Sequence, residues 1–119
     1  MLSFVLATAG LVACASSPIP ADKLSRSEGA VRGAEELGAE QDPTAALHLK
    51  LAREQLAIGK KLIEGGDNAR AEGVLLRAEA DAEVAMNMAR ASKAKVDAIQ
   101  TIQEVQKAKM SIPQQEGIQ

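Results

Sequence analysis

The chain contains one cysteine, Cys14, and the residues before it give its thiol a chemical role. An apolar run from Leu2 to Ala13 carries no charged residue and ends in Leu11-Val12-Ala13, directly before Cys14. The run is shorter than the roughly 20 apolar residues that cross a bilayer core of about 30 Å. It has the length of the hydrophobic region of a secretory signal. A thiol placed after such a segment is a candidate for covalent attachment of lipid.

The tetrapeptide Leu11-Val12-Ala13-Cys14 resembles the bacterial lipoprotein box, whose cysteine is acylated on sulfur, exposed by cleavage and then acylated on its new amino group. This resemblance implies that residues 1–13 are a lipoprotein signal peptide and that residues 14–21 are a lipidated tether. The expected partner is a membrane that anchors the protein without being spanned by it. Ala15 stands where inner-membrane lipoproteins typically carry aspartate, so the resemblance implies the periplasmic side of a Gram-negative outer membrane.

The signal departs from the usual pattern at its start. Secretory signals normally open with a basic residue, whereas the first one here is Lys23. Either the true start lies upstream of Met1, so that the signal peptide is truncated, or the signal is a poor one. The alternative is that Cys14 is a free structural or redox thiol behind a short apolar N-terminus.

Other residues that often carry chemistry lack companions. His48 is the only imidazole and has no second histidine or free thiol beside it, so we predict a partly buried structural residue. Glu79, Asp81 and Glu83 could suggest a cation site, but residues two apart on a helix diverge by about 200°. We therefore expect a solvated acidic face. The glycine-rich segment 65–68 is predicted to be a turn. We expect no metal, no cofactor and no catalytic residue.

Composition narrows the classes of partner. The formal net charge is −2, which gives no reason to expect nucleic acid. Phe4 is the only aromatic residue and lies in the segment expected to be removed. Ligands that are commonly recognised by aromatic faces, such as nucleobases and quaternary ammonium ions, are therefore disfavoured. A core without aromatic side chains must be built from aliphatic residues and alanine.

The sequence predicts an all-α fold, with helices over residues 22–37, 43–64 and 68–110. Strong helix formers dominate, and no segment shows the alternation of a strand. Asp42-Pro43 is a typical helix start, and Gly65-Gly66 a typical helix end. We expect a helical domain over residues 22–112 and a frayed tail over residues 113–119.

The predicted third helix carries a coiled-coil-like seam rich in alanine. Its members alternate spacings of four and three: Ala71, Leu75, Ala78, Ala82, Ala85, Ala89, Ser92, Val96 and Ile99. The predicted second helix carries two apolar stripes, which indicates two neighbours. One stripe is Ala45, Leu49, Ala52, Leu56 and Ile63; the other is Leu47, Leu51, Ile58 and Leu62. We therefore favour a three-helix bundle, an antiparallel hairpin with the first helix folded back on it.

The third helix is about twice as long as the second, so its last part extends beyond the hairpin. Val96, Ile99, Ile102 and Val105 lie in this extension, and we predict that they form an interaction surface for a protein partner or for self-association. The alternative is a first helix collinear with the second, which would cover these residues and make them core.

Several segments resemble domain-of-unknown-function family 4398, a family of small helical bacterial envelope lipoproteins. They are the stretch from Leu37 to Pro43, Leu49-Lys-Leu-Ala-Arg-Glu-Gln-Leu, the turn at residues 65–68 and Arg77-Ala-Glu-Ala-Asp-Ala-Glu. The resemblance covers approximately residues 24–110. It implies a helical lipoprotein that faces the periplasm, and it transfers no catalytic residue.

These observations predict a lipid-anchored envelope protein that acts as a non-enzymatic structural or adaptor module. A second hypothesis is a helical subunit of an envelope complex or homo-oligomer. An enzyme or a carrier of a small ligand is the least supported hypothesis, since no set of polar residues converges in the sequence pattern.

Overall fold

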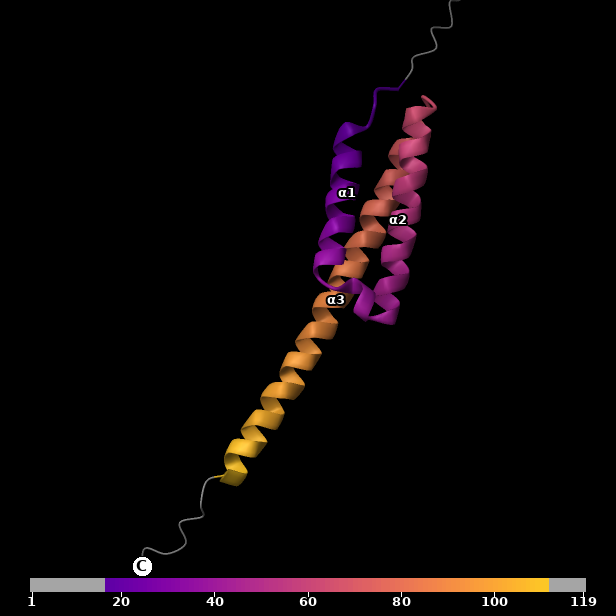
Figure 1. The fold of residues 1–119 in the computed structure, drawn as a ribbon. Helices are drawn as coiled ribbons and strands as arrows, with labels where there is room; N and C mark the ends of the chain where they lie inside the picture. The colour runs from indigo at the N-terminus through magenta and orange to yellow at the C-terminus, as the bar shows by residue number, and fades with distance from the viewer. Residues whose placement is uncertain (1–16, 112–119) are drawn as a thin grey trace, which may run out of the picture.

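The computed structural model describes residues 17–111, which form three α-helices and one 3₁₀ turn (Figure 1). The helices are α1 (Ala21–Glu36), α2 (Pro43–Glu64) and α3 (Asn68–Ser111), and the turn η1 (Ala39–Gln41) joins the first two. Predictions for the signal segment, for Leu11–Cys14 and for the tail at 113–119 lie outside the described residues.

The three helices form an antiparallel bundle. In Figure 1, α1 and α3 run in the same direction, and α2 runs in the opposite direction. Each helix contacts the other two, so α1 is folded back on the hairpin. The predicted all-α three-helix bundle with a long C-terminal helix is therefore confirmed. No helix within residues 17–111 is long and apolar enough to cross a membrane.

The helix boundaries follow the sequence signals. The Asp42 carboxylate accepts hydrogen bonds from the backbone N–H groups of Thr44 and Ala45, both at 2.9 Å, and so caps the start of α2. At its other end α2 closes on Gly65 and Gly66, and Gly66 takes a φ of 77°, which favours glycine. All three predicted helices match the observed ones to within one residue at either end.

We expect the Asp42 cap to stabilise α2 in a pH-dependent way. The hydrogen bond from the Ala45 backbone is the largest cause that lowers the pKa of Asp42 below its ordinary value of 3.8. A lowered pKa means that the charged carboxylate stabilises the fold above the ordinary value, and that this contribution is lost as the pH falls through the lower, folded-state value. Asp42→Ala should lower the melting temperature at pH 7, measured by circular dichroism.

Asp42→Asn is the control for the cap, because asparagine also accepts the backbone hydrogen bonds but carries no charge. It should melt closer to the wild type than Asp42→Ala does at pH 7. Any remaining difference from the wild type should disappear as the medium is acidified below the ordinary pKa of aspartate. Equal melting temperatures for Asp42→Ala and the wild type at pH 7 would contradict the capping role.

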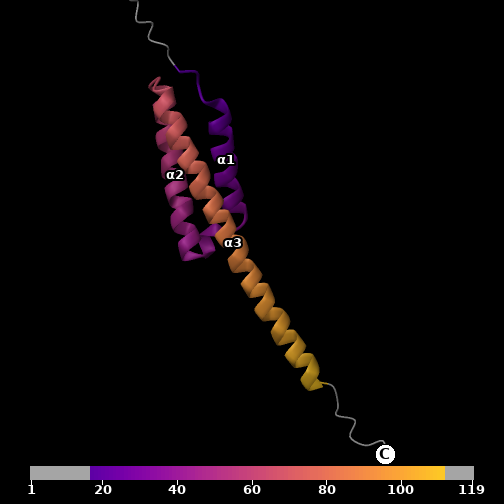
Figure 2. The same cartoon turned by 180° about the vertical axis from the view of Figure 1, so that it is seen from behind.

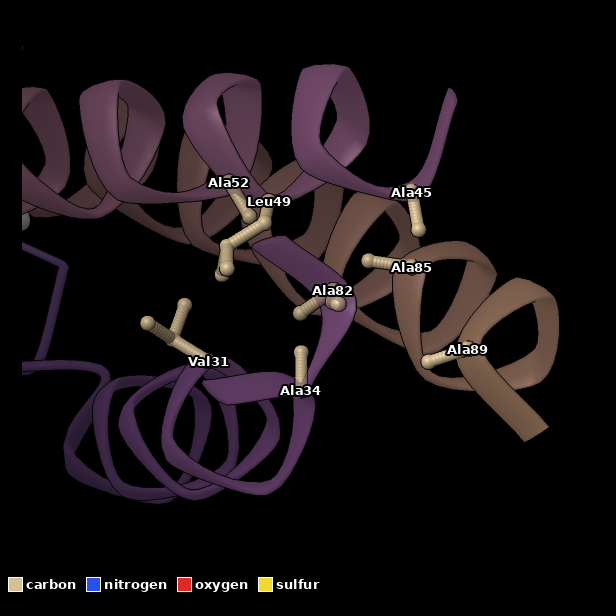
Figure 3. Packing of buried hydrophobic residues seen from close by; sticks show 9 residues of the cluster. Val31, Ala34, Ala45, Leu49, Ala52, Ala82, Ala85 and Ala89 are labelled. Carbon is tan, nitrogen blue, oxygen red and sulfur yellow. The ribbon is translucent and has the colours of Figure 1, made fainter. Parts of the chain in front are cut away.

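The core is thin and consists mainly of alanine. Within residues 17–111, nine of the twelve buried hydrophobic residues are alanines, and the larger ones are Val31, Leu49 and Leu75. Figure 3 shows how Val31 and Ala34 of α1 point towards Leu49 of α2 and Ala82 of α3. Small side chains let the helix axes approach closely, but each buries little apolar surface. The predicted alanine seam of α3 is therefore the bundle's core from Ala71 to Ala89.

The second predicted stripe of α2 does not contact a helix in the way we expected. In the second stripe Leu47 and Ile58 are 55% and 50% exposed, and Leu51 and Leu62 are partly buried. The fully buried hydrophobic positions, Ala45, Leu49 and Ala52, all belong to the first stripe. The helix does touch two neighbours, but α1 packs beside the same stripe as α3. Two ion pairs connect α2 to α1 at the edge of this contact. Lys60 pairs with Glu28 at 2.6 Å, and Arg53 pairs with Glu35 at 2.6 Å.

Gly59 of α2 is buried against Leu75 of α3. A Cβ atom at this position would lie 2.5 Å from Cδ2 of Leu75, well inside van der Waals contact. Leu75 is fully buried, so it occupies the space that a larger residue at position 59 would need. The glycine is therefore part of the packing between the two helices.

The second half of α3 projects from the bundle. The last buried residue of α3 is Ala89, and every residue from Lys93 to Ser111 is exposed. Figure 2, seen from behind, shows that no other helix lies beside this half. The alternative of a collinear first helix that covers it is therefore wrong, because η1 turns the chain back and α1 packs along the buried half of α3.

Candidate interaction surface

The projecting segment, residues 90–111, is the part of the fold that presents apolar side chains without a neighbour in the described chain. It is 22 residues long, which at 1.5 Å per residue is about 33 Å. The four residues singled out in the sequence are 47–57% exposed: Val96, Ile99, Ile102 and Val105. A continuous helical segment with exposed large aliphatic residues is a typical feature of an interaction site.

The side chains of the projecting segment divide into two arcs when placed at 100° per residue. Ile99 and Ile102 lie about 60° apart at the centre of an apolar arc, and Val96 and Val105 lie at its two edges. The opposite arc carries polar residues such as Asp97, Glu104 and Lys107. The arc also contains polar residues on either side of the isoleucine pair along the helix: Lys95, Gln103, Gln106 and Lys109.

The projecting segment and the bundle differ in charge. Residues 90–111 contain five Lys or Arg and two Asp or Glu, whereas residues 17–89 contain nine and thirteen. The projecting segment is therefore basic and the bundle is acidic. A contact between the tip of one segment and the bundle of another molecule would be electrostatically favourable.

Two shallow hollows lie at the root of the projecting segment, where α3 leaves the bundle. One lies between the α1–η1 connection and α3, with Leu37, Ser92 and Val96 among its walls. The other lies at the start of α2 and is lined by Asp42, Thr44, Met88, Ala91, Ser92 and Lys95. The side chains of Ser92 and Lys95 add to the backbone hydrogen bonds that lower the pKa of Asp42. The root therefore combines two hollows of mixed polar and apolar lining with the Asp42 carboxylate, whose pKa these contacts lower.

The connection between α1 and α2 is held in place by Arg53 of α2. Its guanidinium donates to Glu35 of α1 from Nε at 2.8 Å and to Glu40 of η1 from Nη2 at 2.7 Å. The hydrogen bonds to Glu40 and then Glu35 raise the pKa of Arg53 above its ordinary value. This pair of contacts fixes η1 beside α2 and so shapes the root of the projecting segment.

His48 is half-buried, as predicted, and it has a partner that the sequence analysis missed. Its Nδ1 lies 3.0 Å from an oxygen of Asp81 on α3, and the Gln55 side-chain amide donates to the other oxygen at 2.8 Å. The prediction of a fully solvated acidic face is therefore wrong for Asp81, because α2 covers it. These contacts join α2 to α3 on the flank of the bundle. The contact of His48 with Asp81 could not be predicted from residue spacing within one helix.

The remaining site predictions concern metal binding, lipidation and the projecting segment. Within residues 17–111, the structure shows no group of three or more His, Cys, Asp or Glu side chains that could hold a metal ion. Cys14 and the rest of Leu11–Cys14 lie outside the described residues, so lipidation stays a prediction. Val96, Ile99, Ile102 and Val105 are exposed as the interaction hypothesis requires, while the nature of their partner is a separate question.

Comparison with known proteins identifies one family. Neither the curated proteins nor the solved structures that were searched gave a match. The family model described as "Domain of unknown function (DUF4398)" matches residues 22–101, which include all but the first residue of α1, all of α2 and the buried half of α3. The match covers more than half of the chain and extends into the projecting segment. The chain therefore belongs to the DUF4398 family.

Proposed function

We propose that this protein is a lipid-anchored bacterial envelope protein that acts as a non-enzymatic structural or adaptor module. Cys14 would carry the lipid, and the helical domain would face the periplasm from the outer membrane. The observation that carries the proposal is the arrangement of the two ends of the molecule. The described chain begins with Ser17 at one end of the bundle, and the projecting half of α3 extends from the other end (Figure 1).

This arrangement suits a protein that holds one partner at a distance from a membrane. The bundle is about 33 Å long and the projecting segment adds about the same length, since α3 has twice as many residues as α2. A lipid at Cys14 would fix the first end, and the apolar arc around Ile99 and Ile102 would be available at the second. Membership of the DUF4398 family is consistent with this role but does not assign it.

Lipidation of Cys14 is the first prediction of this proposal. The full precursor, expressed in a Gram-negative host from a verified start codon, should lose the signal segment and gain the mass of its acyl chains. Two or more acyl chains give stable anchoring where one is marginal, at about 0.8 kcal/mol for each buried CH₂. We therefore expect the protein in the membrane fraction and, after density separation, in the outer membrane.

Cys14→Ser should leave an unmodified protein outside the membrane fraction. Ser16→Ala is the matched control, because it changes a residue two positions away and keeps the Cys14 thiol. The intact mass of each variant measures its acylation, and fractionation measures its membrane binding. A wild-type product that stays unmodified and soluble would refute the proposed anchoring. Equal membrane binding by the wild type and Cys14→Ser would do so as well.

A further inference from the structure

We propose that the projecting half of α3 pairs with the same segment of a second copy of this chain, antiparallel and in one register. The pairing has a two-fold axis between Gln100 and Thr101. This inference rests on the proposed function, because it names the partner of the projecting end. It does not require lipid at Cys14, so the two can fail independently.

The lengths of α2 and α3 show how much of α3 a second copy would have to cover. α3 has 44 residues and α2 has 22, so α2 covers half of α3 and leaves 22 residues projecting. A second copy supplies another 22-residue segment, which is the length needed to cover that half. In an antiparallel pair this segment runs in the same direction as α2.

The apolar residues are placed symmetrically about the proposed axis. Ile99 and Ile102 are equidistant from the point between Gln100 and Thr101, and so are Val96 and Val105. An antiparallel pair therefore brings Ile99 of each copy beside the other copy's Ile102, at the centre of the apolar arc. The valines then flank this centre on both edges. Such a self-complementary surface is what a two-fold dimer requires.

The lysines on the apolar arc decide the direction of pairing. In a parallel pair Lys95 would face the other copy's Lys95, and Lys109 would face the other copy's Lys109, which places like charges together. In the antiparallel pair Lys95 faces Gln106 of the other copy, and Lys109 faces Ser92. The aliphatic stem of a lysine can pack on apolar neighbours while its ammonium group stays in water. The antiparallel arrangement is therefore favoured.

The tip of the segment also fits the root of the other copy. Lys109 would lie opposite Ser92, beside the hollow that contains Asp42, so the basic tip meets a carboxylate of the acidic bundle. Met110, which is 81% exposed in the single chain, would lie at the height of Ala91, next to the recess walled by Leu37, Ser92 and Val96.

The paired molecule would be a rod. It would consist of three sections end to end: one bundle, the paired segments and the other bundle. Each section is 22 helical residues long, so the rod is about 100 Å long at 1.5 Å per residue. The two N-terminal tethers would leave from its opposite ends.

Cysteine crosslinking tests the partner, the register and the direction together. The chain from residue 17 to 119 keeps the whole described core and lacks Cys14, so its result is independent of lipidation. In the proposed dimer, Lys95→Cys on one chain faces Gln106→Cys on the other, whereas two copies of Lys95→Cys stand about 16 Å apart along the helix. A disulfide needs Cα atoms within about 7 Å.

We therefore expect a covalent dimer only when the Lys95→Cys and Gln106→Cys chains are mixed and oxidised. Asp97→Cys mixed with Glu104→Cys is the matched control, because these positions have the same register but lie on the opposite arc; they should not crosslink. A covalent dimer from Lys95→Cys alone would show parallel pairing and overturn the proposal. No crosslink from the mixture would also overturn it.

Light scattering gives a second, independent reading. Residues 17–119 should have the mass of two chains, and Ile99→Glu/Ile102→Glu should have the mass of one. Gln100→Glu/Thr101→Glu adds the same charges at the same height on the polar arc and should remain dimeric. A wild-type segment that stays monomeric at high concentration would overturn the proposal. Circular dichroism melts check that the bundle itself folds in each variant.

Discussion

Leu49→Ala should destabilise the bundle by about 2–5 kcal/mol, the usual cost of removing a fully buried leucine side chain. Leu49 is one of only two buried leucines in the described residues, and it lies among alanines that cannot expand to fill the space it leaves (Figure 3). The three helices meet around it, so no single helix can shift to close the cavity. Much of the stability of the domain would be lost in one substitution.

The measurement is urea unfolding followed by circular dichroism at 222 nm, with residues 17–119 of the wild type as reference. A domain of this size has a total stability on the order of 5–10 kcal/mol. The variant should therefore unfold at a much lower urea concentration, or be partly unfolded without denaturant. The slope of the transition should change little, because the surface exposed on unfolding is almost the same.

Leu47→Ala is the matched control for this experiment. It removes the same atoms from the same helix, but Leu47 is more than half exposed. We expect its effect to remain within about 0.5 kcal/mol, as for most surface substitutions. Equal losses from the two variants would contradict the assignment of the core to the first stripe of α2.

The outcome for the two stripes shows what the sequence of one helix can and cannot predict. The period of the apolar residues, the Asp42-Pro43 start and the Gly65-Gly66 end determine local structure, and they predicted the helices to within a residue. The choice between the stripes depends on where another helix lies. Leu47 and Leu49 have the same side chain, and only the tertiary arrangement makes one of them core.

The same distinction applies to the candidate site. Helix lengths predicted that Val96 and Ile99 would project, because that conclusion needs only local signals and a count of residues. The contact of His48 with Asp81 joins positions 33 residues apart, and the recess near Leu37 needs the 3₁₀ turn that the sequence analysis did not predict. Contacts across helices depend on register and rotation, which the spacing within one helix does not determine.

Gly59 is the strongest case of a residue whose role appears only in the assembled bundle. In an isolated helix, glycine is less favourable than alanine by about 1 kcal/mol, so local propensity alone predicts that replacing it would help. In the bundle, a Cβ atom at position 59 would meet Cδ2 and Cγ of Leu75 at 2.5 and 2.8 Å. Leu75 is fully buried, so a residue larger than glycine at position 59 requires this side chain to move within the core.

Gly59→Val should therefore destabilise the domain by about 1–3 kcal/mol, the usual cost of overpacking a close helix contact. Gly73→Val is its matched control, since Gly73 is also a helix-interior glycine but has no atom within 4 Å of an added Cβ. The control should change stability by less than about 0.5 kcal/mol, in the stabilising direction, because valine is a better helix former than glycine. Urea unfolding of both variants beside the wild type measures the difference. If Gly59→Val were as stable as Gly73→Val, α2 and α3 would have to lie further apart than the contact of Gly59 with Leu75 requires.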